Sequence, residues 1–184
     1  MATATKLMTA EEFMLLPEPV DGSRHELVRG EVVTMFPPNW EHGEIAFNIA
    51  FAIKMYLLTN PIGRITVEGG SVVERDPDTV RGPDVSFMSK ERMPLEKRMN
   101  CYAEGAPDLC VEVLSPSNTR THIREKLGEY FAGGAKLVWV VDPNERSVKV
   151  YRDAANARTV KEDAALDGGD ILPGFSCPVS QLFN

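Results

Sequence analysis

Three polar residues of this chain have the types and spacing that metal-dependent hydrolysis needs. Asp84 follows Pro83 at the start of a short apolar segment, and Glu112 lies inside the apolar run 109–114. Two carboxylates on neighbouring strands can bind a hard divalent cation through oxygen atoms, which favours Mg²⁺ or Mn²⁺ over zinc. Lys126, on the next predicted helix, could orient a water molecule or neutralise charge that develops on a phosphate.

The position of Glu112 most needs an explanation. An ionised carboxylate in a strand that is buried on both faces is costly unless a cation, a metal ion or hydrogen-bond donors compensate it. A structural alternative is that Glu112 is the buried ion-pair partner of Arg120, Arg124 or Lys126. The corresponding alternative for Asp84 is a cap at the start of a strand.

The segment around Glu112 predicts a strand, a helix and a second strand. Residues 109–114 have the continuous apolar character of a buried strand, and residues 136–141 repeat it. Between them, apolar side chains recur at helical spacing until Gly133 and Gly134 end the helix. The apolar positions are Ile123, Leu127, Tyr130 and Phe131. This order implies a right-handed parallel crossover, with the helix packed over Glu112.

The rest of the chain reads as a hairpin, a long helix and several short strands. Residues 24–35 alternate around a central Arg-Gly pair, as a hairpin does when one face is buried. Residues 39–59 have a wide apolar stripe at helical spacing. We interpret residues 76–82 as a polar turn and residues 90–105 as a helix fragment with a loop. A further turn is expected at residues 173–174.

Length and composition favour a single domain. A chain of 184 residues can bury about 70% of the surface that it exposes when unfolded. We expect an N-terminal helix and hairpin at 9–36, a core at 39–155 and a tail at 156–184. No apolar run is long enough to cross a membrane, and the start of the chain lacks the apolar core of a secretory signal, so a cytoplasmic location is expected.

Charge and cysteine content exclude some classes of protein. The net charge of −7 argues against a protein that coats nucleic acid, but not against an enzyme that meets phosphates through a local cation site. The three cysteines form no CxxC pair, so neither a disulfide framework nor a thiolate zinc site is indicated.

Several blocks of the sequence, in this order, resemble the Uma-two family of endonuclease-like proteins. They are ELVRGEVVTM, EHG at the head of the long helix, RGPDVSF, APDLCVEVLSPSN, EKLGEYFAGG and LVWVVDP. The resemblance covers roughly residues 9 to 155 and extends to the PD-(D/E)XK nuclease superfamily. It implies an α/β fold with a restriction-endonuclease-like core, in which a mixed central β-sheet is flanked by helices. It also implies a metal site where the sheet opens.

The resemblance gives individual residues expected roles. Asp84 corresponds to the aspartate of the PD pair and Glu112 to the acidic residue of the second motif, and both would bind the metal ion together with the main-chain carbonyl of Val113. The usual motif lysine lies two residues after the acid, where this chain has Leu114. Lys126, on the following helix, is the expected substitute.

Four further residues are candidates for accessory roles. Glu26 and Glu31 of the hairpin and His42 of the long helix match family positions. His122 stands where the family often has an aspartate, four residues before the helix lysine, and histidine can also bind a metal ion. The structural alternatives are exposed hairpin residues for the two glutamates and a solvated neighbour of a helix cap for His42.

The sequence therefore predicts an endonuclease that uses Mg²⁺ or Mn²⁺ to hydrolyse phosphodiester bonds in DNA. The competing hypothesis is a catalytically inactive module with the same fold that binds protein or nucleic acid. The acidic balance of the chain, Leu114 and His122 favour this second hypothesis. A homodimer is expected only because most soluble oligomers are symmetric dimers.

Overall fold

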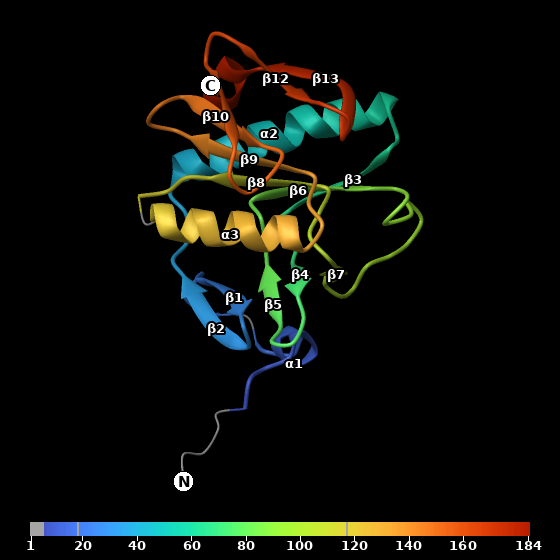
Figure 1. Ribbon diagram of the computed structural model, residues 1–184, viewed down its shortest axis with the longest axis vertical. Helices are drawn as coiled ribbons and strands as arrows, with labels where there is room; N and C mark the ends of the chain where they lie inside the picture. Colours follow the sequence, from blue (N-terminus) through green and yellow to red (C-terminus); the bar gives the residue numbers. More distant parts are fainter. Residues whose placement is uncertain (1–5, 18, 117) are drawn as a thin grey trace.

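The computed structural model describes residues 6–17, 19–116 and 118–184, and Figure 1 shows their arrangement in layers. Helices α2 (Trp40–Thr59) and α3 (Arg120–Ala132) lie on opposite faces of a six-stranded sheet. A second, five-stranded sheet lies beyond α3, and a C-terminal hairpin packs beside α2 against the same face of the six-stranded sheet. Helix α3 therefore lies between the two sheets, with one side exposed to solvent. No helix in the described part of the chain is long and apolar enough to span a membrane.

The six-stranded sheet is mixed, as the family resemblance implies. Its strands, in spatial order, are β11 (Ala157–Lys161), β10 (Ser147–Tyr151), β9 (Leu137–Asp142), β8 (Leu109–Val113), β6 (Val85–Ser89) and β3 (Gly63–Val67). Strands β8 and β9 are parallel, and the other neighbours are antiparallel. Helix α3 connects β8 to β9, begins after a cap at Thr119 and ends at Gly133, which confirms the predicted crossover.

The two faces of this sheet belong to different hydrophobic clusters. Val111 of β8 packs in the cluster on the α2 side, whereas its neighbour Cys110 packs with Leu127 of α3. Successive side chains of a strand point to opposite faces, so Glu112 shares the face of Cys110. The predicted position of Glu112 beneath the following helix is confirmed.

The five-stranded sheet consists of β2 (Glu31–Met35), β1 (Arg24–Val28), β5 (Thr79–Arg81), β4 (Ser71–Glu74) and β7 (Ala103–Glu104), in that order. The predicted hairpin of β1 and β2 is confirmed, and Arg29 and Gly30 form its turn with φ of 50° and 78°. A Cβ at Gly30 would lie only 2.6 Å from Leu7 Cβ, so the turn requires glycine at this position. Helix α1 (Ala10–Met14) begins with a capping box formed by Thr9 and Glu12.

Two regions between the hairpin and the crossover differ from the prediction. The expected polar turn contains β5, whose three residues are buried and pair with β1 and β4. The described residues between Lys90 and Gly105 form turns and the short strand β7, and no helix. In the first segment, pairing of β5 with β1 and β4 overrides the local preference for a turn. The second segment is largely exposed, and only Ala103 and Glu104 at its end pair with β4.

The C-terminal turn also lies at a different position. Residues 169–171 connect β12 (Ala165–Gly168) to β13 (Leu172–Pro178), and a 3-10 helix (Val179–Phe183) follows. Pro173 and Gly174 therefore lie inside β13 rather than in a turn. A two-stranded hairpin leaves one edge of each strand unpaired, and proline is tolerated at such an edge.

Candidate active site

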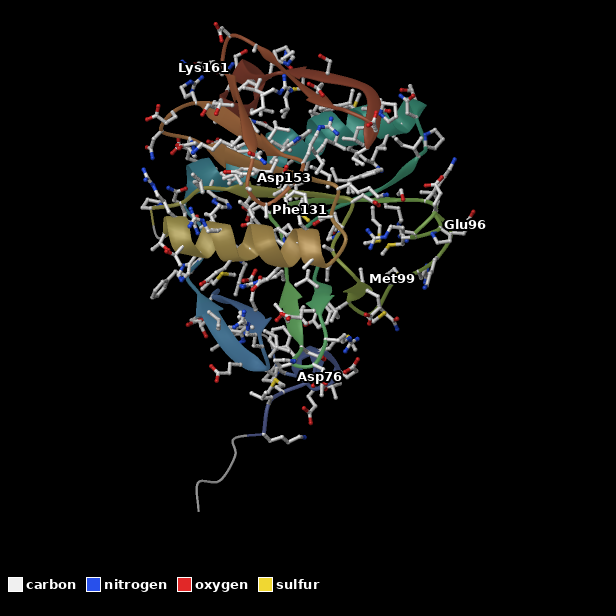
Figure 2. All side chains as sticks on the ribbon, in the orientation of Figure 1. Asp76, Glu96, Met99, Phe131, Asp153 and Lys161 are labelled. Carbon is white, nitrogen blue, oxygen red and sulfur yellow. The ribbon has the colours of Figure 1, made fainter. Side chains whose placement is uncertain are left out.

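A cleft of about 560 Å³ brings together the three residues that the sequence singles out for catalysis. Asp84 lies directly before β6, Glu112 lies in β8 and Lys126 lies in α3. The other walls include the β1–β2 hairpin, the first turn of α2, the end of β5 and the loops before α2 and after β8. The lining residues come from both sheets and from both long helices. Figure 2 shows the described side chains in the orientation of Figure 1, with Phe131 labelled near the end of α3.

The ammonium group of Lys126 binds two carboxylates. Its Nζ atom donates hydrogen bonds to Oε1 and Oε2 of Glu112 at 3.1 and 3.0 Å, and it lies 3.3 Å from Oε1 of Glu26. The hydroxyl group of Tyr130 donates a further hydrogen bond to Oε1 of Glu112 at 2.5 Å. Lys126 and Tyr130 are four residues apart on α3, so both side chains reach the same carboxylate from one helical face.

Glu26 also connects the site to a second ion-pair network. Its Oε2 atom accepts a hydrogen bond from the guanidinium group of Arg81 at 2.6 Å. Arg81 donates two more hydrogen bonds to Glu129 of α3, at 2.6 and 2.9 Å. Two-pronged contacts of this kind fix the relative orientation of both side chains. Arg81 therefore holds β1, β5 and α3 together beneath the cleft.

Asp84 is bound to the strand that contains Glu112. Its Oδ2 atom accepts a hydrogen bond from the main-chain N–H of Val113 at 2.7 Å. Its Oδ1 atom lies 3.0 Å from Nε2 of His42 and 3.8 Å from the guanidinium group of Arg24. The other ring nitrogen of His42, Nδ1, is buried and has no hydrogen-bond partner among the described residues. Nε of Arg24 is likewise buried without such a partner, so two buried nitrogen atoms beside Asp84 have no hydrogen bond within the described residues.

The charges in the cleft shift the pKa of several groups. Burial raises the pKa of Glu112; Lys126 opposes this shift, and the negative charges of Asp84 and Glu26 reinforce it. Burial alone would lower the pKa of Lys126, but Glu112 and Glu26 outweigh it and raise that pKa. Burial would likewise raise the pKa of Glu26, but Lys126 and Arg81 together lower it. Lys126 is therefore protonated at neutral pH, and it faces more than one carboxylate.

The accessory candidates occupy different positions. Glu26 and His42 are buried and contact Lys126 and Asp84, respectively. His122 is exposed and lines the cleft, and its backbone N–H is bound by the capping Thr119. Glu31 is exposed on β2 and does not line the cleft. The structure therefore brings together Glu26 and His42 with the three central residues, and it leaves Glu31 apart.

Sequence reasoning missed three residues of the network. Arg81 lies in the segment interpreted as a turn, Tyr130 is identified only as part of an apolar stripe, and Glu129 is not singled out. The helical residues had a signal, because positions three and four after Lys126 share its face. Arg81 had a weaker one: it follows a Thr-Val pair with high strand propensity.

The cleft offers oxygen atoms that suit a hard divalent cation. Carboxylates of Asp84 and Glu112 line the same cleft, and Glu26 adds a third negative charge beside one lysine. In the described residues, however, no group of three or more His, Cys, Asp or Glu side chains is arranged to hold a metal ion. A metal site formed by two carboxylates and a main-chain carbonyl uses only two such side chains, so it does not require a group of three. A cation there would share the oxygens of Glu112 with Lys126.

Comparisons with known proteins agree with the fold. The family model described as "Uma2: Putative restriction endonuclease" matches residues 10–180. The structure resembles a crystal structure titled as a putative nuclease belonging to DUF820 from Anabaena variabilis, with a TM-score of 0.78 and 24% identity over 96% of this chain and 97% of that chain. A comparison with curated proteins finds no match. The structural likeness confirms the predicted α/β fold with its mixed sheet.

Proposed function

The chain belongs to the Uma2 family of putative restriction endonucleases, and on this premise we propose that it hydrolyses phosphodiester bonds in DNA with the help of Mg²⁺ or Mn²⁺. The observation that supports the proposal most is the meeting of Asp84, Glu112 and Lys126 in one cleft, from three different elements. Buried charges destabilise a fold, so a cluster of them beside a cleft is typical of a functional site.

The two carboxylates would hold the cation. Asp84 and Glu112, with the main-chain carbonyl of Val113, supply the hard oxygen ligands that Mg²⁺ and Mn²⁺ prefer. When bound, such a cation lowers the pKa of a water molecule and stabilises negative charge on a phosphate. The hydrogen bond from the N–H of Val113 to Asp84 keeps the two carboxylates at neighbouring positions of the sheet.

Lys126 would act on the water molecule or on the phosphate. Glu112 and Glu26 keep its ammonium group charged and hold it at the cleft. A positive charge held in this way stabilises negative charge that develops on a phosphate in the transition state. Tyr130 and Arg81 act through other residues, because they orient Glu112 and Glu26. Lys126 thus takes the place of the motif lysine for which this chain has Leu114.

One observation favours a catalytically inactive nuclease-fold module as the second candidate. Lys126 occupies both oxygen atoms of Glu112, and Tyr130 donates a third hydrogen bond to the same carboxylate. A carboxylate satisfied in this way can be purely structural. In that case the chain would bind a protein or nucleic acid partner without cutting it, and the cleft would not bind a metal ion.

Cleavage of DNA tests the proposal. Supercoiled plasmid and single-stranded DNA are incubated at low salt with Mg²⁺ or Mn²⁺, with and without a chelator, and with wild type, Asp84→Asn or Glu112→Gln. Glu125→Gln is the matched control, because it makes the same change at the exposed neighbour of Lys126 that also lines the cleft. We expect metal-dependent cleavage by wild type and by the control, and at least about a hundredfold less by the other two variants.

Calorimetry with Mn²⁺ separates the two candidates. The nuclease proposal requires saturable binding by wild type that Asp84→Asn abolishes. If wild type neither binds the ion nor cuts either DNA, the inactive module is the correct reading. Cleavage that persists in both folded carboxylate variants would place the active site elsewhere.

A further inference from the structure

Helix α2 exposes a stripe of large apolar side chains. It buries Ile45, Ile49 and Ile53 in the main core, yet five large residues on its other face remain about half exposed or more. Their exposed fractions are 84% for Trp40, 65% for Phe47, 55% for Phe51, 50% for Met55 and 63% for Leu58. An exposed apolar surface of this extent on one helix is typical of a protein interface.

The order of residues along this stripe is self-complementary. A second copy of α2, turned by half a rotation about an axis midway between Phe47 and Phe51, runs antiparallel to the first. Each position on one copy then faces the position on the other copy that lies equally far from the axis on the opposite side. The exposed pairs are Trp40 with Leu58, Gly43 with Met55, Glu44 with Lys54 and Phe47 with Phe51.

Charge and shape both favour this antiparallel pairing. Glu44 and Lys54 are exposed, and neither forms an ion pair within the part of the chain that the structure describes. The pairing brings each Glu44 opposite a Lys54, whereas parallel helices in register would bring like charges together. At Gly43, an added Cβ would meet nothing within 4 Å, which leaves room for the long side chain of Met55.

We propose that the exposed stripe of α2 binds the same stripe of a second copy of this chain and forms a two-fold symmetric, antiparallel homodimer. A two-fold interface is built from one surface that is complementary to itself, which is the property of this stripe. The stacked rings of Phe47 and Phe51, with centroids 6.1 Å apart, form its centre. Aromatic residues are enriched at the centres of such interfaces.

The dimer leaves both clefts open. His42 lies on the buried side of α2 beside Asp84, opposite to the stripe. In the antiparallel pair, His42 of one copy lies level with position 56 of the other copy. The two His42 residues are therefore 14 positions, or about 21 Å, apart along the helix direction at 1.5 Å per residue. The proposal concerns only assembly, and it stands whether or not the chain cuts DNA.

Sedimentation over a range of protein concentrations tests the interface. We expect wild type to sediment with twice the mass of the chain, and Phe47→Glu to weaken self-association by about thirtyfold or more. Leu15→Glu is the control, because it adds the same charge at an exposed apolar position outside α2. A wild-type monomer at every concentration would overturn the proposal, as would a dimer that Phe47→Glu leaves intact.

Charge reversal tests the antiparallel pairing itself. Glu44→Lys or Lys54→Glu alone brings like charges together twice in each dimer and is expected to weaken it by about tenfold. The double variant restores both pairs, and so does an equimolar mixture of the two single variants, which should form the mixed dimer. Failure of both the double variant and the mixture to recover the wild-type affinity would exclude this arrangement. Because the four proteins differ only at exposed positions, circular dichroism should show the same folded state for all of them.

Discussion

Lys126 and Glu112 form a two-pronged contact between a helix and the central strand of the larger sheet, with both carboxylate oxygens within 3.1 Å of Nζ. The two residues are 14 positions apart, and the crossover from β8 to α3 brings them together. Lys126 also interacts with two further carboxylates, Glu26 and Asp84, so its removal is expected to affect stability as well as the proposed activity.

Loss of the lysine should destabilise the fold. Lys126→Met removes the cation that faces Glu112 and Glu26 and leaves two buried carboxylates without it, which is expected to lower the free energy of unfolding by about 3–5 kcal/mol. The double variant Lys126→Met, Glu112→Gln should regain part of this loss, because one uncompensated charge is gone. Urea unfolding measures both effects. A single variant as stable as wild type would show that the lysine is not a structural partner of the carboxylates.

The two glutamates beside Lys126 should give opposite pH dependences. The pKa of Glu112 is raised in the folded state above 4.5, so the folded protein binds this proton more tightly than the unfolded chain does. The contribution of this bound proton to the free energy of unfolding is fully present below pH 4.5 and is lost as the pH rises through the folded pKa. The pKa of Glu26 is lowered below 4.5, so its contribution is present above that pH and is lost as the pH falls.

This contrast is tested by measuring the free energy of unfolding from pH 3 to pH 8 for wild type, Glu112→Gln and Glu26→Gln. Glutamine resembles a protonated glutamate, so each variant lacks the titration of one group. As the pH rises above about 4.5, wild type should lose stability relative to Glu112→Gln. As the pH falls below about 4.5, wild type should lose stability relative to Glu26→Gln. If the stability of wild type relative to each variant changed with pH in the same direction for both variants, the charge distribution described for the cleft would be contradicted.

The local parts of the fold could be predicted from the sequence. The capping box at Thr9, the hairpin of β1 and β2, and the strand–helix–strand unit around Glu112 depend on periodicity and caps that act over a few residues. The division of the strands into two sheets could not be predicted in this way. Strands β3 and β4 are neighbours in the sequence, yet β3 pairs with β6 in one sheet and β4 pairs with β5 and β7 in the other.

The site was predictable to a similar degree. Asp84 and Glu112 stand out because carboxylates are rare beside buried strands. The contacts that complete the site join residues far apart in the chain: Arg81 and Glu129 are 48 positions apart, and Arg81 and Glu26 are 55 positions apart. Their pairing depends on how α3 packs against the five-stranded sheet. No local pattern of residues contains that information.

The sequence contains two further Pro-Asp pairs, Pro77-Asp78 and Pro107-Asp108, and neither of their aspartates lines the cleft. Asp108 is only 1% exposed and lies outside the cleft. Its Oδ2 atom accepts a hydrogen bond from the N–H of Ser89 at 2.9 Å, and its Oδ1 atom lies 2.8 Å from Nζ of Lys136. Burial would raise the pKa of Asp108, but Lys136, the N–H of Ser89 and the positive charge of Arg92 outweigh burial and lower it.

Asp108→Asn is therefore expected to affect mainly stability, and Asp84→Asn mainly activity. The first removes a charge that a lysine and a backbone donor stabilise, and should lower the free energy of unfolding by about 1–3 kcal/mol while the folded fraction keeps its activity. The second removes a proposed metal ligand, and should abolish metal-dependent cleavage with a smaller loss of stability. Thermal unfolding and plasmid cleavage, measured on the same preparations, separate the two aspartates. If Asp108→Asn lost activity while remaining folded, the assignment of the cleft as the active site would be wrong.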